Sequence, residues 1–188
     1  TQQVSSAASD VYKRQQLANK NNLNTSLQQL KKISYYKTGR LFEASAKSAA
    51  MLSGKSIPFI ENISKAAKLI GIAFQVRDDL LDYGVSKGNI GKPEMQDILE
   101  DKITYPLYFA LKYSNKKDSS KILKKLKNKD FSIEEVADFV SSSNAFNKCN
   151  SLIQNYSNEI SKCINQISNK EIRDEMLNLS ESLKNRYE

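Results

Sequence analysis

An acidic cluster ends the most apolar stretch of this 188-residue chain, and its spacing suits a divalent cation. Asp82 follows Asp78 by four residues and Asp79 by three, spacings that place side chains on one face of a helix. Gln75 precedes the cluster by about one turn. Carboxylates gathered on one face repel each other and lose hydration, so a hard, oxygen-seeking cation would stabilise them. We expect these acids to bind Mg²⁺; the alternative is an acidic triplet solvated on a helix surface.

The residues before this cluster predict a buried helix that positions it. Between Ala66 and Leu81, apolar side chains occur on nearly every side of the helix axis, which is typical of a helix inside a protein core. We expect this helix to run from about Phe59 to Tyr83. Gly71 within it indicates close packing against a neighbour. The carboxylates would then project from the end of a buried element.

A lysine–threonine pair is the second candidate group, on a preceding helix expected from about Leu27 to Leu52. Lys37 falls among apolar residues that recur every three or four positions, and Thr38 follows it. Two interpretations stay open. Lys37 either extends along its apolar stem to solvent, or faces an anion inside the bundle. The apolar residues of this stripe are Leu30, Ile33, Leu41 and Ala44.

The segment from Gly84 to Asp101 is expected to be a loop, because it is rich in glycine and contains a proline. Lys87, Lys92 and Lys102 lie in or just after it. The segment is either a flap over phosphate groups or a plain connection. Further helices are expected after Thr104, from Ser114 to Lys129, from Ser132 to Ser141, from Asn144 to Ile167 and from Ser168 to Arg186.

The composition favours one helical domain without β-strands. Only 6 Gly and 3 Pro occur, too few for the many tight turns of a sheet-rich fold. Thr25 or Ser26 is a plausible N-cap for the first clear helix. Charged residues interrupt the most apolar segment, which excludes a membrane-spanning helix. The absence of His excludes His-ligated zinc and His-based catalysis.

The net charge and the cysteines limit which partners and which cellular compartment are expected. The net charge of +8 favours polyanions: nucleic acid, anionic lipid or phosphorylated small molecules. We expect no nucleic-acid partner, because the lysine-rich segment 114–129 carries no aromatic stacking platform. Cys149 and Cys163 fall in one predicted helix, about 21 Å apart. They are therefore expected to be free thiols, as in the reducing cytoplasm.

These motifs together resemble the trans-isoprenyl diphosphate synthases, the polyprenyl synthetase family. The segment from Phe74 to Tyr83 is similar to the family's second aspartate-rich motif, FQxxDDxxD, and the segment from Tyr36 to Ala44 is similar to its KT-containing helix. The resemblance extends over about residues 16–188. Downstream, the residues that follow the family's GKP…D…ExKxTxP pattern are Gly91, Lys92, Pro93, Asp97, Glu100, Lys102, Thr104 and Pro106.

The resemblance implies an all-α helical bundle of the isoprenoid synthase type, truncated at its N-terminus, and the activity of a prenyltransferase. It implies Mg²⁺-dependent condensation of an allylic diphosphate with isopentenyl diphosphate, as in long-chain polyprenyl diphosphate synthases. A homodimer is also implied. The implied metal ligands are Asp78, Asp79 and Asp82; the implied diphosphate-binding residues are Lys37, Lys92 and Lys102; and the implied catalytic residues are Lys37, Thr38 and Gln75.

The chain also departs from the family pattern. The family's first aspartate-rich motif is absent, and Lys13 stands where the family usually has Glu. We therefore expect residues 1–15 to be extraneous and residues 16–188 to be the C-terminal half of a polyprenyl synthetase domain. Such a fragment would be inactive alone. The alternative is a non-catalytic regulatory or scaffolding subunit of a prenyl synthase.

Overall fold

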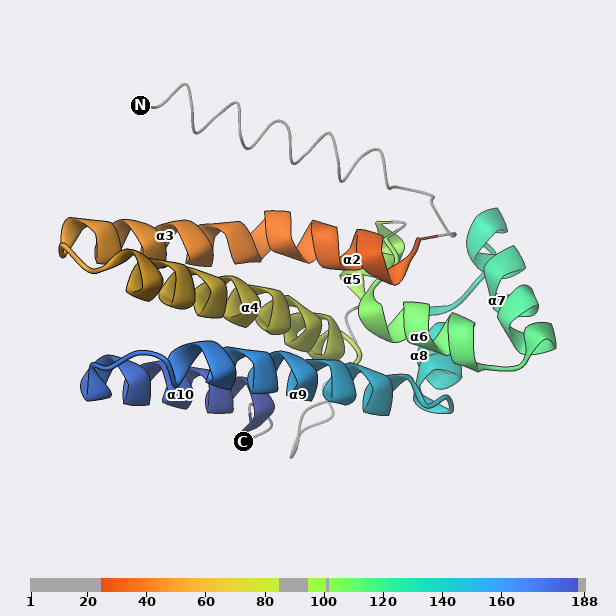
Figure 1. Ribbon diagram of the computed structural model, residues 1–188. Coiled ribbons are helices and arrows are strands. Elements are labelled where there is room, and N and C mark those ends of the chain that lie inside the picture. The colour runs from red at the N-terminus through yellow and green to blue at the C-terminus, as the bar shows by residue number, and fades with distance from the viewer. Residues whose placement is uncertain (1–24, 85–94, 101, 186–188) are drawn as a thin grey trace, which may run out of the picture.

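The computed structural model of the protein describes residues 25–84, 95–100 and 102–185, and within these ranges it is helical without β-strands (Figure 1). The expected all-α class is confirmed. No helix among these residues is long and apolar enough to cross a membrane. In chain order the elements are α2 (Leu27–Ser34), the π-helix η1 (Tyr35–Gly39), α3 (Arg40–Leu52), α4 (Ile57–Leu81), α5 (Gln96–Leu99), α6 (Tyr105–Tyr113), α7 (Lys116–Asn128), α8 (Ile133–Ser141), α9 (Ala145–Ile164) and α10 (Lys170–Asn185).

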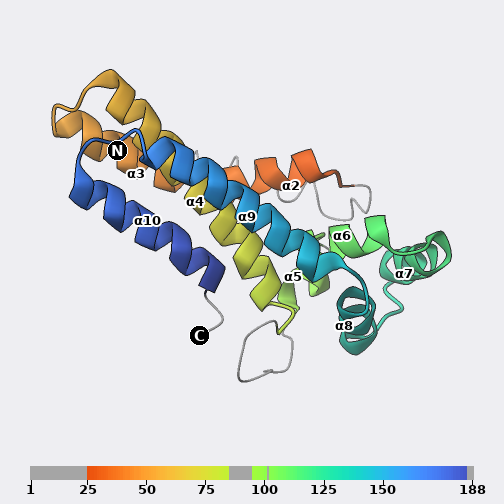
Figure 2. The ribbon, with the colours of Figure 1, turned by 60° about the horizontal axis from the view of Figure 1, so that its bottom comes forward.

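The central element is α4, which packs between α3 on one side and α9 on the other, with α10 beside α9 (Figures 1 and 2). Its buried residues surround the helix axis, so the prediction of a buried helix is confirmed. It begins at Ile57 and ends at Leu81, two residues earlier at each end than expected. Pro58 near its first turn favours this start, because proline lacks the N–H that a helix start leaves unpaired.

The helix before α4 has the expected outer bounds but is not one uniform α-helix. Ser26 caps it, since its Oγ accepts from the backbone N–H of Gln29. In turn, the side-chain Oε1 of Gln29 accepts from the backbone N–H of Ser26. The π-helical turn η1 then changes the rotation of the side chains that follow. Leu30 is buried, whereas Leu41 is 70% exposed. The single stripe expected through Leu30, Lys37 and Leu41 is therefore wrong.

Two glycines let η1 lie directly on α4. A Cβ added to Gly71 would be 2.7 Å from the Cα of Gly39, closer than packed atoms come. A Cβ added to Gly39 would meet the backbone carbonyl oxygen of Lys68 at 3.1 Å. The close approach predicted at Gly71 is confirmed. Its consequence is that the segment carrying Lys37 lies against the helix carrying the acids.

Three expectations for the rest of the chain need correction. The stretch expected as a loop from Gly84 to Asp101 contains α5. The last helix begins at Lys170, and Asn169 rather than Ser168 accepts from the backbone N–H of Ile172. The sequence also predicts an apolar stripe on this helix through Ile172, Met176, Leu179 and Leu183, but Leu179 is 44% exposed. Asparagine is an equally good cap, so the sequence pattern did not separate the two residues.

Candidate functional site

A pocket opens where α2, η1, the end of α4 and the segment leading into α6 meet. It brings together two of the three predicted lysines, Gln75 and one of the three predicted acids. Lys92 lies outside the described residues. The lining residues are Thr25, Leu30, Ile33, Ser34, Lys37, Gln75, Asp79, Asp97, Lys102, Ile103, Thr104 and Tyr105.

Asp79 is the buried carboxylate of this pocket, with 7% of its surface exposed. One of its oxygens accepts from the Gln75 Nε2 amide at 2.9 Å, and the other accepts from the backbone N–H of Tyr105 at 3.1 Å. Burial raises the pKa of Asp79 to about 7, although these two hydrogen bonds favour the charged form. The carboxylate is therefore held in a fixed position but is costly to ionise in the metal-free protein.

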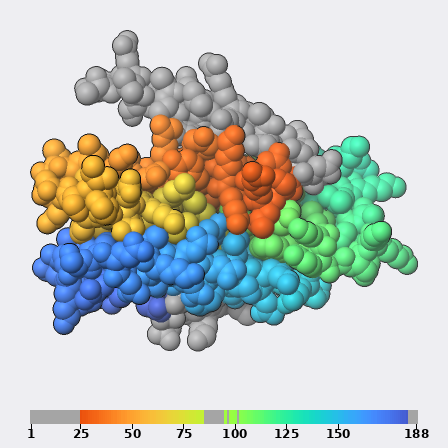
Figure 3. All heavy atoms as spheres, in the orientation of Figure 1, coloured from red at the N-terminus to blue at the C-terminus, as the bar shows by residue number. Residues whose placement is uncertain are grey.

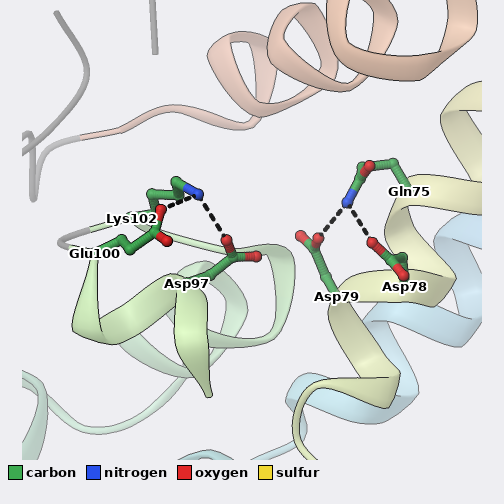
Figure 4. A network of polar contacts seen from close by, with 6 residues as sticks. All are labelled: Gln75, Asp78, Asp79, Asp97, Glu100 and Lys102. Carbon is green, nitrogen blue, oxygen red and sulfur yellow. Dashed lines mark hydrogen bonds and ion pairs between the residues drawn. The ribbon is translucent and has the colours of Figure 1, made fainter. Parts of the chain in front are cut away.

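The other two acids sit in different environments from Asp79. Asp78 is exposed, and its Oδ2 accepts from the same Gln75 amide at 3.1 Å (Figure 4). Asp82 is half-buried at the C-cap of α4. The Gln75 amide group thus joins Asp78 and Asp79 and holds their oxygens near each other. Among the described residues, no group of three acidic or cysteine side chains forms a ready-made metal cluster.

Thr38 and Lys37 reach this network from η1. The Thr38 hydroxyl donates to Gln75 Oε1 at 3.2 Å, which fixes the orientation of the Gln75 amide toward the acids. The side chain of Lys37 is exposed and lines the pocket. Lys37 is also close enough to Asp79 for its charge to favour the ionised carboxyl and lower its pKa. This placement agrees with both interpretations of Lys37, because its side chain reaches solvent and also lines a pocket that could hold an anion.

Lys102 faces the acids of α4 from across the pocket (Figure 4). Its Nζ lies 3.0 Å from Asp97 Oδ1 and 2.6 Å from Glu100 Oε2. Partial burial disfavours the charged form, but the hydrogen bonds to Glu100 and Asp97 outweigh it and raise the pKa of Lys102. Lys102 is therefore a fully charged lysine that two acids hold beside the pocket.

The sequence reasoning assigned no role to Ser34 and Tyr105, which hold the pocket walls together. The Tyr105 hydroxyl and the Ser34 hydroxyl lie 3.0 Å apart, both buried, and Ser34 also donates to the backbone carbonyl of Leu30. Tyr105 thus bonds α2 through its hydroxyl and α4 through its N–H. The signal in the sequence was the Thr104-Tyr105-Pro106 segment, whose proline marks the start of α6.

The arrangement combines cations and carboxylates around one opening with apolar residues behind them. The lysines suit an anion, and the paired carboxylates suit a hard divalent cation. A phosphate or diphosphate group bound through a divalent ion would satisfy both sets at once. This chemistry follows from the placed residues alone.

Comparison with known proteins gives the family and the fold. Residues 3–143 match the family model described as polyprenyl synthetase. The octaprenyl diphosphate synthase of Haemophilus influenzae is 34% identical over 108 residues, which cover 57% of this chain and 33% of that protein.

Two solved structures share the fold. One is a decaprenyl diphosphate synthase from Rhodobacter capsulatus, with a TM-score of 0.85 and 22% identity over 97% of this chain and 57% of that chain. The other is a polyprenyl synthase from Caulobacter crescentus in complex with calcium and isoprenyl diphosphate, with a TM-score of 0.83 and 22% identity over 99% of this chain and 58% of that chain. The chain therefore spans a third of this curated relative and less than three fifths of these solved chains.

Proposed function

The chain belongs to the polyprenyl synthetase family, and from that premise we propose that it serves in the Mg²⁺-dependent elongation of a prenyl chain. The proposed reaction joins an allylic diphosphate to isopentenyl diphosphate and releases inorganic diphosphate. The names of relatives such as the octaprenyl diphosphate synthase support a long-chain product. The observation that carries the proposal is the pocket that gathers Lys37, Lys102, Gln75 and Asp79.

Asp78 and Asp79 fit a magnesium site of the kind that uses one or two carboxylates and completes its ligands with phosphate oxygens and water. The shared bond to Gln75 holds the two carboxylates together, and the exposed Asp78 leaves oxygen free for a metal. Asp82 lies one turn further along the same helix end. When bound, Mg²⁺ would stabilise the negative charge that grows on the departing diphosphate.

The lysines of the pocket neutralise the diphosphate as its charge grows. Lys37 and Lys102 act as point charges from opposite walls, and we assign the same role to Lys92. Lys102 exchanges part of its pairing with Asp97 and Glu100 for the diphosphate on binding. The cation is thus kept in place before the anion arrives.

Thr38 and Gln75 flank the allylic carbon, and their oxygens face the positive charge that develops there. The Thr38–Gln75 hydrogen bond fixes these oxygens before the reaction, so little reorganisation is needed as the charge forms. Leu30 and Ile33 on the same wall exclude water that would otherwise capture the carbocation.

The family resemblance implies that turnover needs a second acidic motif in addition to Asp78–Asp82, and this sequence contains DDxxD once. We propose that this chain binds the Mg²⁺ diphosphate by itself and elongates a prenyl chain only where another segment or chain supplies that motif. The alternative is a non-catalytic subunit of a prenyl synthase. It predicts weak diphosphate binding and a stable complex with a complete synthase.

The test is calorimetric titration of the chain with inorganic diphosphate in the presence and absence of Mg²⁺. We expect saturable binding that requires the metal, and an Asp78→Asn or Lys37→Ala variant to weaken it at least tenfold, since charged pairs are worth about 1.5–3 kcal/mol. Asp130→Asn and Lys65→Ala, both exposed elsewhere, are the matched controls. Metal-independent binding, or equal losses in the controls, would refute the assigned site.

A turnover assay with labelled isopentenyl diphosphate and an allylic primer then separates binding from catalysis. We expect no elongation by this chain alone and elongation when the second acidic motif is restored. We also propose that the chain forms a homodimer and is located in the cytoplasm. Light scattering coupled to size-exclusion chromatography would decide the oligomeric state.

A further inference from the structure

A second charged surface lies on α7, away from the residues of the pocket. Ile122 and Leu126 turn the apolar side of this helix inward. Lys117, Lys121 and Lys124, spaced by four and three residues, point the opposite way and are exposed. We call these three lysines the α7 basic face.

The lysines of the α7 basic face form no ion pair with the acids that the structure describes. The one acidic residue of the helix, Asp118, is bonded to the side chain of the capping Asn115: its Oδ2 accepts from the Asn115 Nδ2 amide at 2.6 Å, and its backbone N–H donates to Asn115 Oδ1 at 2.9 Å. Lys125 lies off the face and bonds both carboxylate oxygens of Glu135 at 2.7 Å. Within the part of the chain that the structure describes, no ion pair joins a lysine of the face to an acid.

A tyrosine and two more lysines lie together where α6 ends. Tyr113 is 51% exposed, with the Nζ of Lys148 at 4.7 Å and that of Lys112 at 5.8 Å from its ring centroid. One side of the ring stacks on Phe109. Tyrosine combines an apolar ring with a polar hydroxyl, and it is enriched with lysine where proteins meet a membrane surface.

The position of α7 lets this surface reach a flat partner. Figures 1 and 2 place α7 and α8 at the end of the molecule opposite the turn between α3 and α4, and Figure 3 shows the side chains of α6 and α7 at that end. The helix α6 links the pocket to it, because Tyr105 lines the pocket and Tyr113 lies about 12 Å further along the helix.

We propose that the α7 basic face docks the protein on an anionic lipid surface. The contact is electrostatic and at headgroup level, because the apolar residues of α7 are committed to the core. Lipid is favoured over nucleic acid for two reasons. The face carries lysine and no arginine, whose planar group binds bases and phosphates in pairs of bonds. The exposed ring of Tyr113 is already stacked on Phe109 on one side, which leaves less of it for a base.

The test is co-sedimentation of the full chain with phosphatidylcholine vesicles that contain about one third phosphatidylserine, against vesicles of phosphatidylcholine alone. We expect binding only to the anionic vesicles, and its loss at about 0.5 M salt. A Lys117→Gln/Lys121→Gln/Lys124→Gln variant should lower the partition coefficient roughly 100-fold. The control variant Lys47→Gln/Lys65→Gln/Lys170→Gln removes the same charge from α3, α4 and α10 and should change it less than about threefold.

Circular dichroism of both variants shows whether they fold, so a loss of binding is not mistaken for unfolding. Equal binding to both kinds of vesicle would overturn the proposal, and so would equal losses in the two variants. Tighter binding to duplex DNA or RNA than to anionic vesicles at the same salt would assign the face to nucleic acid instead. The assay measures no turnover, so its outcome does not depend on the proposed prenyl transfer.

Discussion

At the scale of single residues, the three aspartates at the end of α4 differ in their surroundings, and of the three Asp79 lines the pocket. Asp79 is buried with both oxygens hydrogen-bonded, whereas Asp78 is exposed and shares only the Gln75 amide. In the proposed metal site the two carboxylates would therefore meet the ion differently. Asp79 would bind from a position that two hydrogen bonds fix, and Asp78 would offer an oxygen that faces solvent.

The raised pKa of Asp79 predicts how the stability of the metal-free protein depends on pH. The folded-state pKa, about 7, lies above the value near 4 of an unfolded chain, so the folded state binds this proton more tightly. The stabilisation is complete below pH about 4 and is lost as the pH rises to about 7. We expect the free energy of unfolding to fall by up to about 4 kcal/mol across this range from Asp79.

Urea unfolding at pH 5 and pH 8 measures this effect. Asp79→Asn, which cannot ionise, should reduce the difference in stability between the two pH values by most of that amount. Asp130→Asn, an exposed carboxylate on the α7–α8 connection, should leave the difference unchanged. An Asp79→Asn protein with the pH dependence of the parent would contradict the assignment.

The sequence predicted the spacing of the candidate acids better than it predicted their environments. The spacing of Asp78, Asp79 and Asp82 follows from helix geometry alone. Only Asp79 is buried, and its carboxylate accepts from Tyr105, more than twenty residues away, whose N–H reaches it only in the folded chain. No local pattern contains that contact. The same holds for the Thr38–Gln75 bond, which joins two helices.

At the scale of elements, the contact between η1 and α4 sets the distance between Lys37 and Thr38 on η1 and the acids at the end of α4. Hydrophobic periodicity predicted a helix across this region but not its π-helical turn, because one extra residue in a turn leaves the composition unchanged. The turn explains why Leu41 leaves the buried side. It also places Thr38 within reach of Gln75.

A methyl group at the glycine crossing should separate these elements. Gly71→Ala would bring a Cβ to 2.7 Å from the Cα of Gly39, a backbone atom that cannot move alone. In a helix without neighbours, alanine is more favourable than glycine by roughly 1 kcal/mol. A loss of about 1–3 kcal/mol in the free energy of unfolding would therefore come from the clash with Gly39. We also expect weaker binding of the Mg²⁺ diphosphate, since Thr38 would move away from Gln75.

Gly54→Ala provides the control for this variant. Gly54 has a φ of 62° with nothing near an added Cβ, so alanine there is strained without separating the helices. It should lower the thermal midpoint and leave diphosphate affinity unchanged. A Gly71→Ala protein as stable as the parent, with parent affinity, would show that the crossing tolerates the methyl group.

The bond between Tyr105 and Ser34 should couple the α6 start to α2. Because both hydroxyls are buried, a double-mutant cycle of Tyr105→Phe and Ser34→Ala is expected to give a coupling free energy of about 1 kcal/mol in urea unfolding. Each variant should also weaken diphosphate binding. The buried Ser157–Ser180 pair, 3.2 Å apart and between α9 and α10, is the control cycle. It should lower stability without changing affinity, and equal effects of both cycles on affinity would refute a positioning role.

At the scale of the whole molecule, one core joins α4 to α9 and the shorter helices. The all-α class was predictable, since few glycines and prolines and a period of three to four residues leave little room for strands. The packing partners of each helix were not predictable, because periodicity shows which face of a helix is buried but not which helix covers it. The anchoring of α4 to α10 through Arg77, whose Nε donates to the Leu183 carbonyl at 2.8 Å, is a contact of this kind.

The two cysteines report on the cooperativity of this core. Cys149 is 0% exposed and Cys163 is 5% exposed, both on α9 and both free thiols as predicted. Burial also raises the pKa of Cys149, so little reactive thiolate forms at neutral pH. We expect a thiol reagent to label the native protein only as fast as the molecule opens, and to label both cysteines at once in denaturant.

Ser168→Cys places a thiol at an exposed position and should react immediately under the same conditions. Rapid labelling of Cys149 without denaturant, at a rate insensitive to stabilising Mg²⁺ diphosphate, would mean that α9 opens independently of the rest of the core.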